Sequence, residues 1–184
     1  MITDIILIIA AALFIGVYVS WRAGRIDRLH ARVDTARAAL DVTLLRRSSV
    51  ALELATSGLL DPATSLLLAT AVHGTRNGGR PRDLAESDLT RALRAAFSQP
   101  GFRSSMSGKE GADELLAEVE EATHQVFLAR KFYNDVVALT RDARRRPLVR
   151  LLRLSGNAPI PVFFEMDDSL IADMPAATLA PPIA

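Results

Sequence analysis

The chain begins with a segment that carries no charge, Ile5–Trp21, and arginine follows it at once. A helix rises about 1.5 Å per residue, so these seventeen residues reach about 25 Å, slightly less than the hydrocarbon core of a bilayer. Met1 and Ile2 can lengthen the span, while Tyr18 and Trp21 stand where interfacial aromatic residues are expected. Residues 1–21 therefore predict a transmembrane anchor.

A signal peptide and a buried core helix both fit this segment less well than an anchor does. A cleaved signal peptide needs a basic N-terminal region, but the first four residues offer only the α-amino group and Asp4. No pattern of small residues suited to cleavage follows Tyr18. A buried core helix would not need arginines at one end only. The membrane anchor is therefore the interpretation that the flanking residues favour.

Charge asymmetry predicts the orientation of the anchor. Asp4 precedes the apolar run, whereas four arginines follow it, namely Arg22, Arg25, Arg28 and Arg32. Basic flanks remain on the cytoplasmic side of a membrane. We therefore expect a single-pass protein of the cell membrane, with its N-terminus outside and residues 22–184 in the cytoplasm. The absence of cysteine agrees with a reducing compartment, and it excludes thiol catalysis and cysteine-ligated metal centres.

The segment that follows the anchor has the periodicity of long helices. Apolar residues alternate in steps of three and four from Ile26 to Leu40, and the pattern continues to Leu54 with one slip at Leu44. Gly58 is expected to end this helix. A shorter helix is predicted at about 62–75, because Asp61-Pro62 is a helix start signal, and another at about 83–97. Residues 98–111 are expected to form the loosest loop.

A fourth helix has the most regular pattern of all. Its apolar seam runs from Leu115 to Thr140 in strict steps of four and three, with Asp113 and Glu114 in the first turn and arginines in the last. No stretch alternates as a half-buried strand does. We therefore predict an all-α fold: one transmembrane helix continuous with an antiparallel bundle of about four helices over residues 22–154, two long and two short. Residues 155–184 are expected to be an extended, largely disordered tail.

The expected helix lengths predict that two groups of arginines lie together next to the membrane; we call them the basic collar. If the first long helix leaves the bilayer, the equally long fourth helix returns, and its basic end reaches the arginines that follow the anchor. An anionic leaflet favours such residues by about 1 kcal/mol each. Alternatively, the later arginines only complement a helix C-terminus. The predicted membrane-proximal residues are Arg22, Arg25, Arg28, Arg32, Arg144, Arg145, Arg146, Arg150 and Arg153.

Two motifs resemble the LemA family. The run Ala129-Arg130-Lys131-Phe132-Tyr133-Asn134 is similar to its hallmark of alanine-arginine, two variable residues and tyrosine-asparagine. Val33-Asp34, Leu40-Asp41-Val42, Leu44 and Arg46-Arg47 are similar to its first-helix signature. Thr140-Arg141 stands where the family's second tyrosine-asparagine is usual. The resemblance implies a divergent member: a single-pass membrane protein with a helical cytoplasmic bundle and no established biochemical activity.

The motif residues are expected to have structural roles. They are Asp41, Arg46, Arg47, Arg130, Tyr133 and Asn134. Tyr133 falls on the apolar seam, where a buried aromatic ring needs a partner for its hydroxyl. Asp41 and Arg130 fall at similar heights along their helices, so we predict an ion pair between them that fixes the register of the bundle.

No pattern of residues predicts catalysis. His30, His73 and His124 lie on three different segments without a ligand spacing, and no glycine-rich phosphate loop is present. We therefore expect no enzyme activity, no cofactor and no metal. Arginines without interleaved aromatic residues and a nearly balanced charge argue against nucleic acid. The predicted partners are anionic inner-leaflet lipids and an unidentified protein. The function is that of an interaction or scaffold protein or, alternatively, of a self-assembling structural membrane protein whose heptad faces pair between copies.

Overall fold

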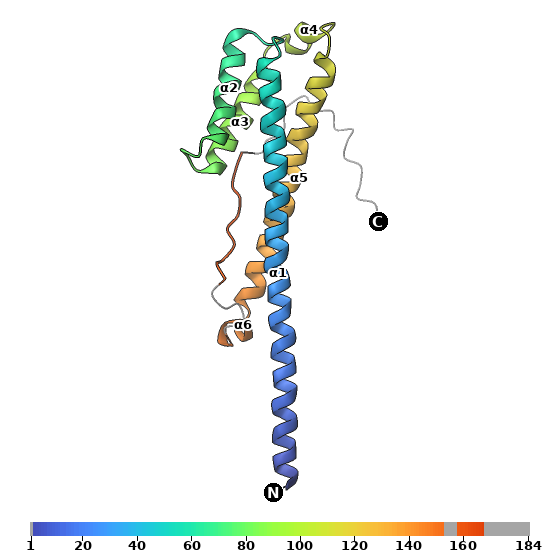
Figure 1. The fold of residues 1–184 in the computed structure, drawn as a ribbon, viewed down its shortest axis with the longest axis vertical. Helices are drawn as coiled ribbons and strands as arrows, with labels where there is room; N and C mark the ends of the chain where they lie inside the picture. The colour runs from blue at the N-terminus through green and yellow to red at the C-terminus, as the bar shows by residue number, and fades with distance from the viewer. Residues whose placement is uncertain (1, 153–157, 168–184) are drawn as a thin grey trace. The chain divides into compact units, whose positions relative to one another are not determined.

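A computed structural model of the chain describes residues 2–152 and 158–167. The described residues form α-helices and contain no strand, as predicted, and residues 158–167 are extended. The helices appear in Figure 1 as α1 (Ile2–Thr56), α2 (Pro62–Arg76), α3 (Arg82–Phe97), α4 (Phe102–Met106), α5 (Ala112–Arg145) and α6 (Pro147–Leu151). The two long and two short helices of the prediction are α1, α5, α2 and α3, and α4 and α6 are one-turn additions.

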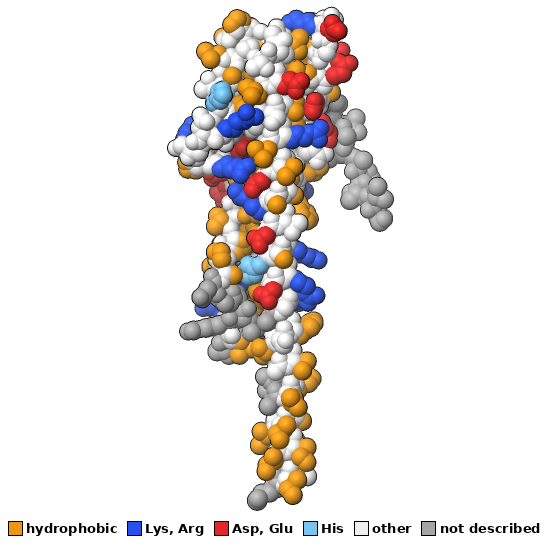
Figure 2. Space-filling view, in the orientation of Figure 1, with side chains coloured by type: hydrophobic (Ala, Val, Ile, Leu, Met, Phe, Trp, Pro, Cys, Tyr) orange, Lys and Arg blue, Asp and Glu red, His pale blue; other side chains and the backbone are white. Residues whose placement is uncertain are grey.

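Helix α1 continues without interruption from the apolar run into the basic segment, as the sequence predicted. Its seam residues are buried except Leu29, which is half-buried; the buried ones are Ile26, Val33, Ala36, Leu40, Leu44, Val50 and Leu54. Upstream of Arg22 the described large apolar side chains are exposed except Val19, which is half-buried, and Figure 2 shows apolar side chains along the N-terminal part of the helix. Among the described residues, no helix combines the length and the apolar character needed to cross a membrane.

The chain divides into two compact units, and α1 and α5 each contribute to both. The first unit comprises Met1–Ala39 and Lys131–Phe163, and the second comprises Leu40–Arg130 and Phe164–Ala184, each within its described residues. The short helices α2 and α3 lie wholly within the second unit. The domain division predicted for residues 22–154 stays a prediction.

The core of the second unit is built by α2, α3 and parts of α1 and α5. Helices α2 and α3 lie side by side (Figure 1), and the apolar cluster draws residues from each of the four. Members of this cluster are Val50, Leu54, Leu68, Val72, Leu89, Leu93 and Val119. The start of α2 is as predicted: Asp61 accepts hydrogen bonds from the backbone N–H groups of Ala63 and Thr64 at 3.0 and 3.1 Å, and Pro62 is the first helical residue.

The segment 98–111, predicted as the loosest loop, is packed onto the second unit instead. It contains α4, which begins after Gly101, a residue in the left-handed region (φ +76°) that favours glycine. Phe102 and Met106 lie four residues apart on one face of α4, and both are buried in the core cluster. The ring centroid of Phe102 is 4.9 Å from that of Phe97. One helical turn with two buried apolar residues therefore fixes this connection.

Part of the tail predicted to be extended and largely disordered lies among the described residues. Residues 158–167 follow an extended path in which Phe164 and Met166 are buried. Burial of these two side chains removes apolar area from water, which offsets the entropy lost by ordering the chain. Residues 155–157 and 168–184 lie outside the described residues.

Replacing Phe102 tests the packing of α4. The Phe102→Ala substitution leaves a cavity beneath the connection and is expected to lower the free energy of unfolding by about 3–5 kcal/mol. Leu66→Ala is the matched control, because Leu66 is 70% exposed and its loss is expected to change stability by less than about 0.5 kcal/mol. Urea titration of the full-length protein in mild detergent, followed by circular dichroism, measures both. Equal effects of the two substitutions would contradict the packed arrangement.

Candidate functional site

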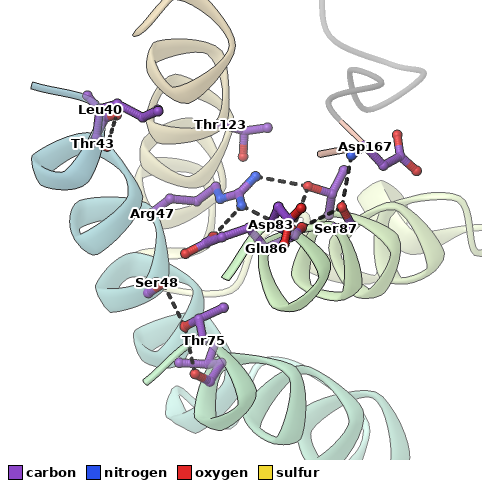
Figure 3. Close-up of polar contacts among 12 residues, drawn as sticks. Leu40, Thr43, Arg47, Ser48, Thr75, Asp83, Glu86, Ser87, Thr123 and Asp167 are labelled. Carbon is purple, nitrogen blue, oxygen red and sulfur yellow. Dashed lines mark hydrogen bonds and ion pairs between the residues drawn. The ribbon is translucent and has the colours of Figure 1, made fainter. Parts of the chain in front are cut away.

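A fully buried ion pair links α1 to α3 inside the second unit. The guanidinium of Arg47 on α1 lies 2.7 Å, from Nη2 to Oε2, from the carboxylate of Glu86 on α3 (Figure 3). The side chains of Arg47 and Glu86 are only 1% and 2% exposed. A charged pair at this depth holds two helices in one relative position, because either group alone would be an uncompensated buried charge.

Burial and pairing act in opposite directions on these two groups. Removal from water lowers the pKa of Arg47, while the charge and hydrogen bond of Glu86 raise it. For Glu86, burial raises the pKa, and the charge and hydrogen bond of Arg47 lower it. In both groups desolvation is the larger influence. The pair is therefore costly to bury, and its stability depends on the neighbouring hydrogen bonds.

Polar groups of α3 complete the surroundings of Arg47. Nη1 of Arg47 donates to the Thr90 hydroxyl at 3.0 Å, and Nη2 also donates to the backbone carbonyl of Glu86 at 3.2 Å. Figure 3 places Thr123 of α5 near the same guanidinium. At the partly exposed border, Arg82 forms an ion pair with Asp41 at 3.0 Å. The guanidinium is thus enclosed by protein groups, and its buried Nε has no hydrogen-bond partner among the described residues.

The sequence identified only one half of this pair. Arg47 was among the predicted motif residues, whereas Glu86 was not. A signal was present, because Glu86 precedes Leu89 by three residues and Leu93 by seven and so falls on the buried face of α3. The neighbouring motif residue Arg46 points outward and lies 3.7 Å from Glu118, with both side chains about half exposed. Sequence reasoning did not distinguish the two arginines.

Tyr133 is buried in the first unit and holds the extended C-terminal segment. Its hydroxyl donates to the backbone carbonyl of Val162 at 2.8 Å, which supplies the partner that a buried tyrosine needs. The guanidinium of Arg37 lies 5.6 Å from the centroid of its ring. Asn134 is half-buried beside it on α5. The tyrosine of the LemA-like motif thus contacts a segment 29 residues later in the chain.

Arg130 is half-buried on α5 and belongs to the second unit, as Asp41 does. Asp41 forms its ion pair with Arg82, a partner that the sequence did not indicate. The predicted pair between Asp41 and Arg130 stays a prediction.

Further contacts hold both ends of the segment 158–167. In the first unit, Arg144 donates to the carbonyls of Ala158 and Pro159, each at 2.9 Å, and the guanidinium of Arg141 lies 5.1 Å from the Phe163 ring centroid. Arg144 also contacts Nε2 of His30 at 3.1 Å. Arg144 is one of the predicted membrane-proximal residues, and that placement stays a prediction. Within the described fold its guanidinium binds the C-terminal backbone, and His30 is half-buried against it.

The other end of this segment is held in the second unit. The backbone N–H of Asp167 donates to the Ser87 hydroxyl at 2.9 Å, and the Asp167 carboxylate lies 3.1 Å from the guanidinium of Arg94 (Figure 3 shows Ser87 and Asp167). Both partners come from α3. Sequence reasoning missed them, because a serine and an arginine on a half-exposed helix carry no distinguishing pattern.

A groove of about 830 Å³ in the first unit collects several of the predicted basic residues. Its arginines come from α1 and from position 146, just beyond α5, and Trp21 also lines it. The lining residues are Trp21, Arg25, Arg28, Leu29, Ala31, Arg32, Leu139, Asp142, Ala143 and Arg146. Arg25, Arg28, Arg32 and Arg146 form no ion pair with any residue of the described segments 2–152 and 158–167. The groove therefore concentrates positive charge that the described fold does not neutralise.

The remaining predicted basic residues lie outside this groove. Arg22 donates to the Tyr18 hydroxyl at 3.2 Å, and Arg145 lies 3.9 Å from Asp142. Arg150 is an exposed residue of α6, and Arg153 lies outside the described residues. The helix lengths predicted that the C-terminal end of α5 lies near the arginines of α1. In the groove, Arg146 lies with Arg25, Arg28 and Arg32.

The described residues contain no cluster of three or more histidine, aspartate or glutamate side chains that could hold a metal ion. The groove itself offers arginines, one aspartate and apolar side chains. This set suits the binding of an anion, because guanidinium groups donate paired hydrogen bonds to phosphate or carboxylate oxygens. It contains no nucleophile paired with a general base.

Comparisons of the chain with family models, with curated proteins and with solved structures find no match. The resemblance to LemA proteins therefore rests on the sequence motifs and stays a prediction. What the molecule does has to be inferred from its groove, its exposed apolar surface and its charge.

The Arg47–Glu86 pair predicts a strongly non-additive pair of substitutions. Arg47→Met leaves Glu86 buried without a counter-charge and is expected to cost about 3–5 kcal/mol of unfolding free energy. The double variant Arg47→Met/Glu86→Leu removes both charges and is expected to recover most of that loss. Arg46→Met is the control, since its half-exposed pair contributes at most about 1 kcal/mol. Chemical denaturation measures all three, and additive losses in the double variant would disprove the coupling.

The contacts of residues 158–163 predict that Tyr133 and Arg144 hold this segment. The double variant Tyr133→Phe/Arg144→Gln removes three hydrogen bonds to backbone carbonyls, each contributing about 1 kcal/mol. Chymotrypsin is expected to cleave after Phe163 several times faster in this variant, because local opening precedes proteolysis. Tyr18→Phe is the control on the exposed part of α1. An unchanged rate of cleavage after Phe163 would refute the proposed attachment.

Proposed function

We propose that this protein is a membrane-anchored helical interaction or scaffold protein of the LemA type, without catalytic activity, that acts at the cytoplasmic face of the cell membrane. One observation supports this above all others: an exposed, uncharged apolar run leads directly into a groove lined by arginines without ion-pair partners in the described fold. A membrane covers apolar side chains and supplies anionic headgroups next to them. Such an interface accounts for both features.

The exposure of the first twenty-one residues is the support for an anchor. Ile5, Leu7, Phe14 and Val17 are each more than half exposed, and Asp4 is the only charged side chain before Arg22. A soluble protein rarely exposes so long an apolar surface, because each square ångström in contact with water costs about 25 cal/mol. The side chains at positions 11, 12 and 15 of this run lie outside the described residues.

The proposed absence of catalysis is supported by the kinds of residue that are buried. The fully buried charged groups, Arg47 and Glu86, neutralise each other and are enclosed by the fold. The motif tyrosine, Tyr133, uses its hydroxyl to hold a backbone carbonyl. Motif residues whose polar groups bind other parts of the chain support structural roles. Partners would then bind to the exposed surface of the protein.

A second candidate function has its own support in exposed apolar residues of the bundle. Val42, Leu45, Phe132 and Leu139 are each more than half exposed although they lie beyond the anchor. Phe132 and Leu139 are seven residues apart and therefore share one face of α5. Such a face favours the alternative of a structural membrane protein that assembles by pairing of heptad faces between copies.

The anchor predicts retention in membranes and a defined orientation. The chain has no cysteine, so Thr3→Cys and Ser104→Cys each introduce a unique label site on opposite sides of the proposed span. A membrane-impermeant maleimide is expected to label intact cells at residue 3, and at residue 104 only after permeabilisation. Labelling of both sites in intact cells, or of neither, would contradict the proposed topology.

Carbonate extraction of the same membranes tests the anchor itself. Wild-type protein is expected to remain in the pellet, whereas Ile8→Asp/Phe14→Asp is expected to move to the supernatant, because a charge at the bilayer centre costs about 3 kcal/mol. Leu66→Asp/Leu67→Asp carries the same charge on exposed positions of α2 and is expected to remain bound. Equal extraction of wild type and both variants would exclude an anchor in the apolar run.

A further inference from the structure

We propose that the groove of the first unit is a binding site for the phosphate-bearing headgroup of an anionic phospholipid. This inference rests on the proposed function, because the membrane supplies the ligand. It goes beyond general attraction to a charged leaflet, since it assigns one lipid to one groove. The groove belongs wholly to the first unit. Its lining residues lie within positions 21–32 of α1 and within positions 139–146, at and just beyond the C-terminal end of α5.

The groove arginines come from two parts of the chain. Arg25, Arg28 and Arg32 follow one another at intervals of three and four residues, which places them on one side of α1. Arg146 reaches the same groove from just beyond α5. Guanidinium groups bind phosphate oxygens through paired, charge-assisted hydrogen bonds. Two elements thus supply donors from two sides.

The charge of the groove favours an anion over any other ligand. Four arginines and one acid, Asp142, line it, which leaves a net charge of +3 (4 − 1). Asp142 lies 3.9 Å from Arg145, an arginine outside the lining, so part of its charge is already neutralised. Other exposed arginines of this chain, such as Arg80 and Arg103, have carboxylate partners. The groove arginines lack such partners among the described residues, and a phosphate would supply the missing charge.

The apolar lining distinguishes a lipid from a free anion. Leu29, Leu139, Ala143 and Trp21 line the groove together with the arginines. These side chains suit the glycerol backbone and the first methylene groups of an acyl chain, which inorganic phosphate does not have. Tryptophan is typical of the headgroup level of a bilayer. The combination therefore fits an amphipathic phosphate better than a soluble one.

The only tryptophan of the chain makes the proposal directly measurable. Trp21 lies in the groove lining, so its fluorescence reports on the occupant. Full-length protein in neutral detergent is titrated with phosphatidylglycerol, with phosphatidylcholine and with inorganic phosphate. We expect a saturable change in emission with phosphatidylglycerol, at least tenfold weaker binding of phosphatidylcholine, and no saturation by phosphate in the same range. Equal responses to both lipids, or no response to either, would overturn the proposal.

Two double variants that each remove two positive charges distinguish lipid binding in the groove from general attraction to all the membrane-proximal arginines. Arg32→Gln/Arg146→Gln removes two groove donors and is expected to weaken phosphatidylglycerol binding by at least about tenfold, since the loss of even one charge-assisted hydrogen bond has that effect. Arg22→Gln/Arg150→Gln removes the same charge from predicted membrane-proximal positions outside the groove lining, and is expected to weaken binding less than threefold. Equal weakening by both pairs would overturn a defined site.

Two further outcomes of the titration would identify a ligand other than a phospholipid in the groove. Carbonate extraction then distinguishes failure of the groove proposal from failure of the membrane anchor. Saturation by inorganic phosphate at the same concentrations as lipid would identify a soluble anion site and overturn the lipid assignment. Displacement of bound phosphatidylglycerol by a short oligonucleotide at similar concentration would do the same in favour of nucleic acid. Carbonate extraction is measured on the same groove variants. If the wild type and these variants all remain in the membrane while the wild type shows no preference for phosphatidylglycerol, the groove proposal fails and the anchor stands.

Discussion

A buried arginine needs a counter-charge, and the arrangement of the second unit depends on the way Arg47 obtains one. Apolar side chains alone allow α3 to rotate or slide on α1 at little cost, because leucine and alanine contacts are similar in many registers. The 2.7 Å contact to Glu86 and the bond to Thr90 are possible in one register only. Since desolvation acts against both charges, any other register would leave at least one of them unpaired. The pair therefore selects one packing among several that the apolar residues permit.

The sequence predicted those parts of the fold that depend on periodicity. The seams of α1 and α5 are regular over many turns, and Asp61-Pro62 is a local start signal, so their positions follow from neighbours in the chain. Helix α4 was missed because one turn is too short to show a period, and only the burial of Phe102 and Met106 defines it. The same limit applies to the ordered residues 158–167.

The candidate sites were less predictable, because their partners are backbone atoms or residues without a pattern. Tyr133 was expected to have a hydrogen-bond partner, but its partner is the carbonyl of Val162, and every residue has a carbonyl. Arg144 likewise binds two carbonyls. The arginines of the groove were predictable as a group, since the lengths of two helices bring their basic ends together. Which of them line the groove depends on helix rotation, which charge counting does not reveal.

Leu139 connects the two candidate functions and sets them against each other. It lines the basic groove, and it shares the exposed face of α5 with Phe132. A second copy that paired through this face would cover Leu139 and thereby part of the groove. A phospholipid in the groove would cover the same side chain and shorten the apolar face available for pairing. Because one apolar side chain cannot be buried against both partners, lipid occupancy and assembly through this face exclude each other. An anionic membrane would therefore favour the form in which this face of α5 is unpaired.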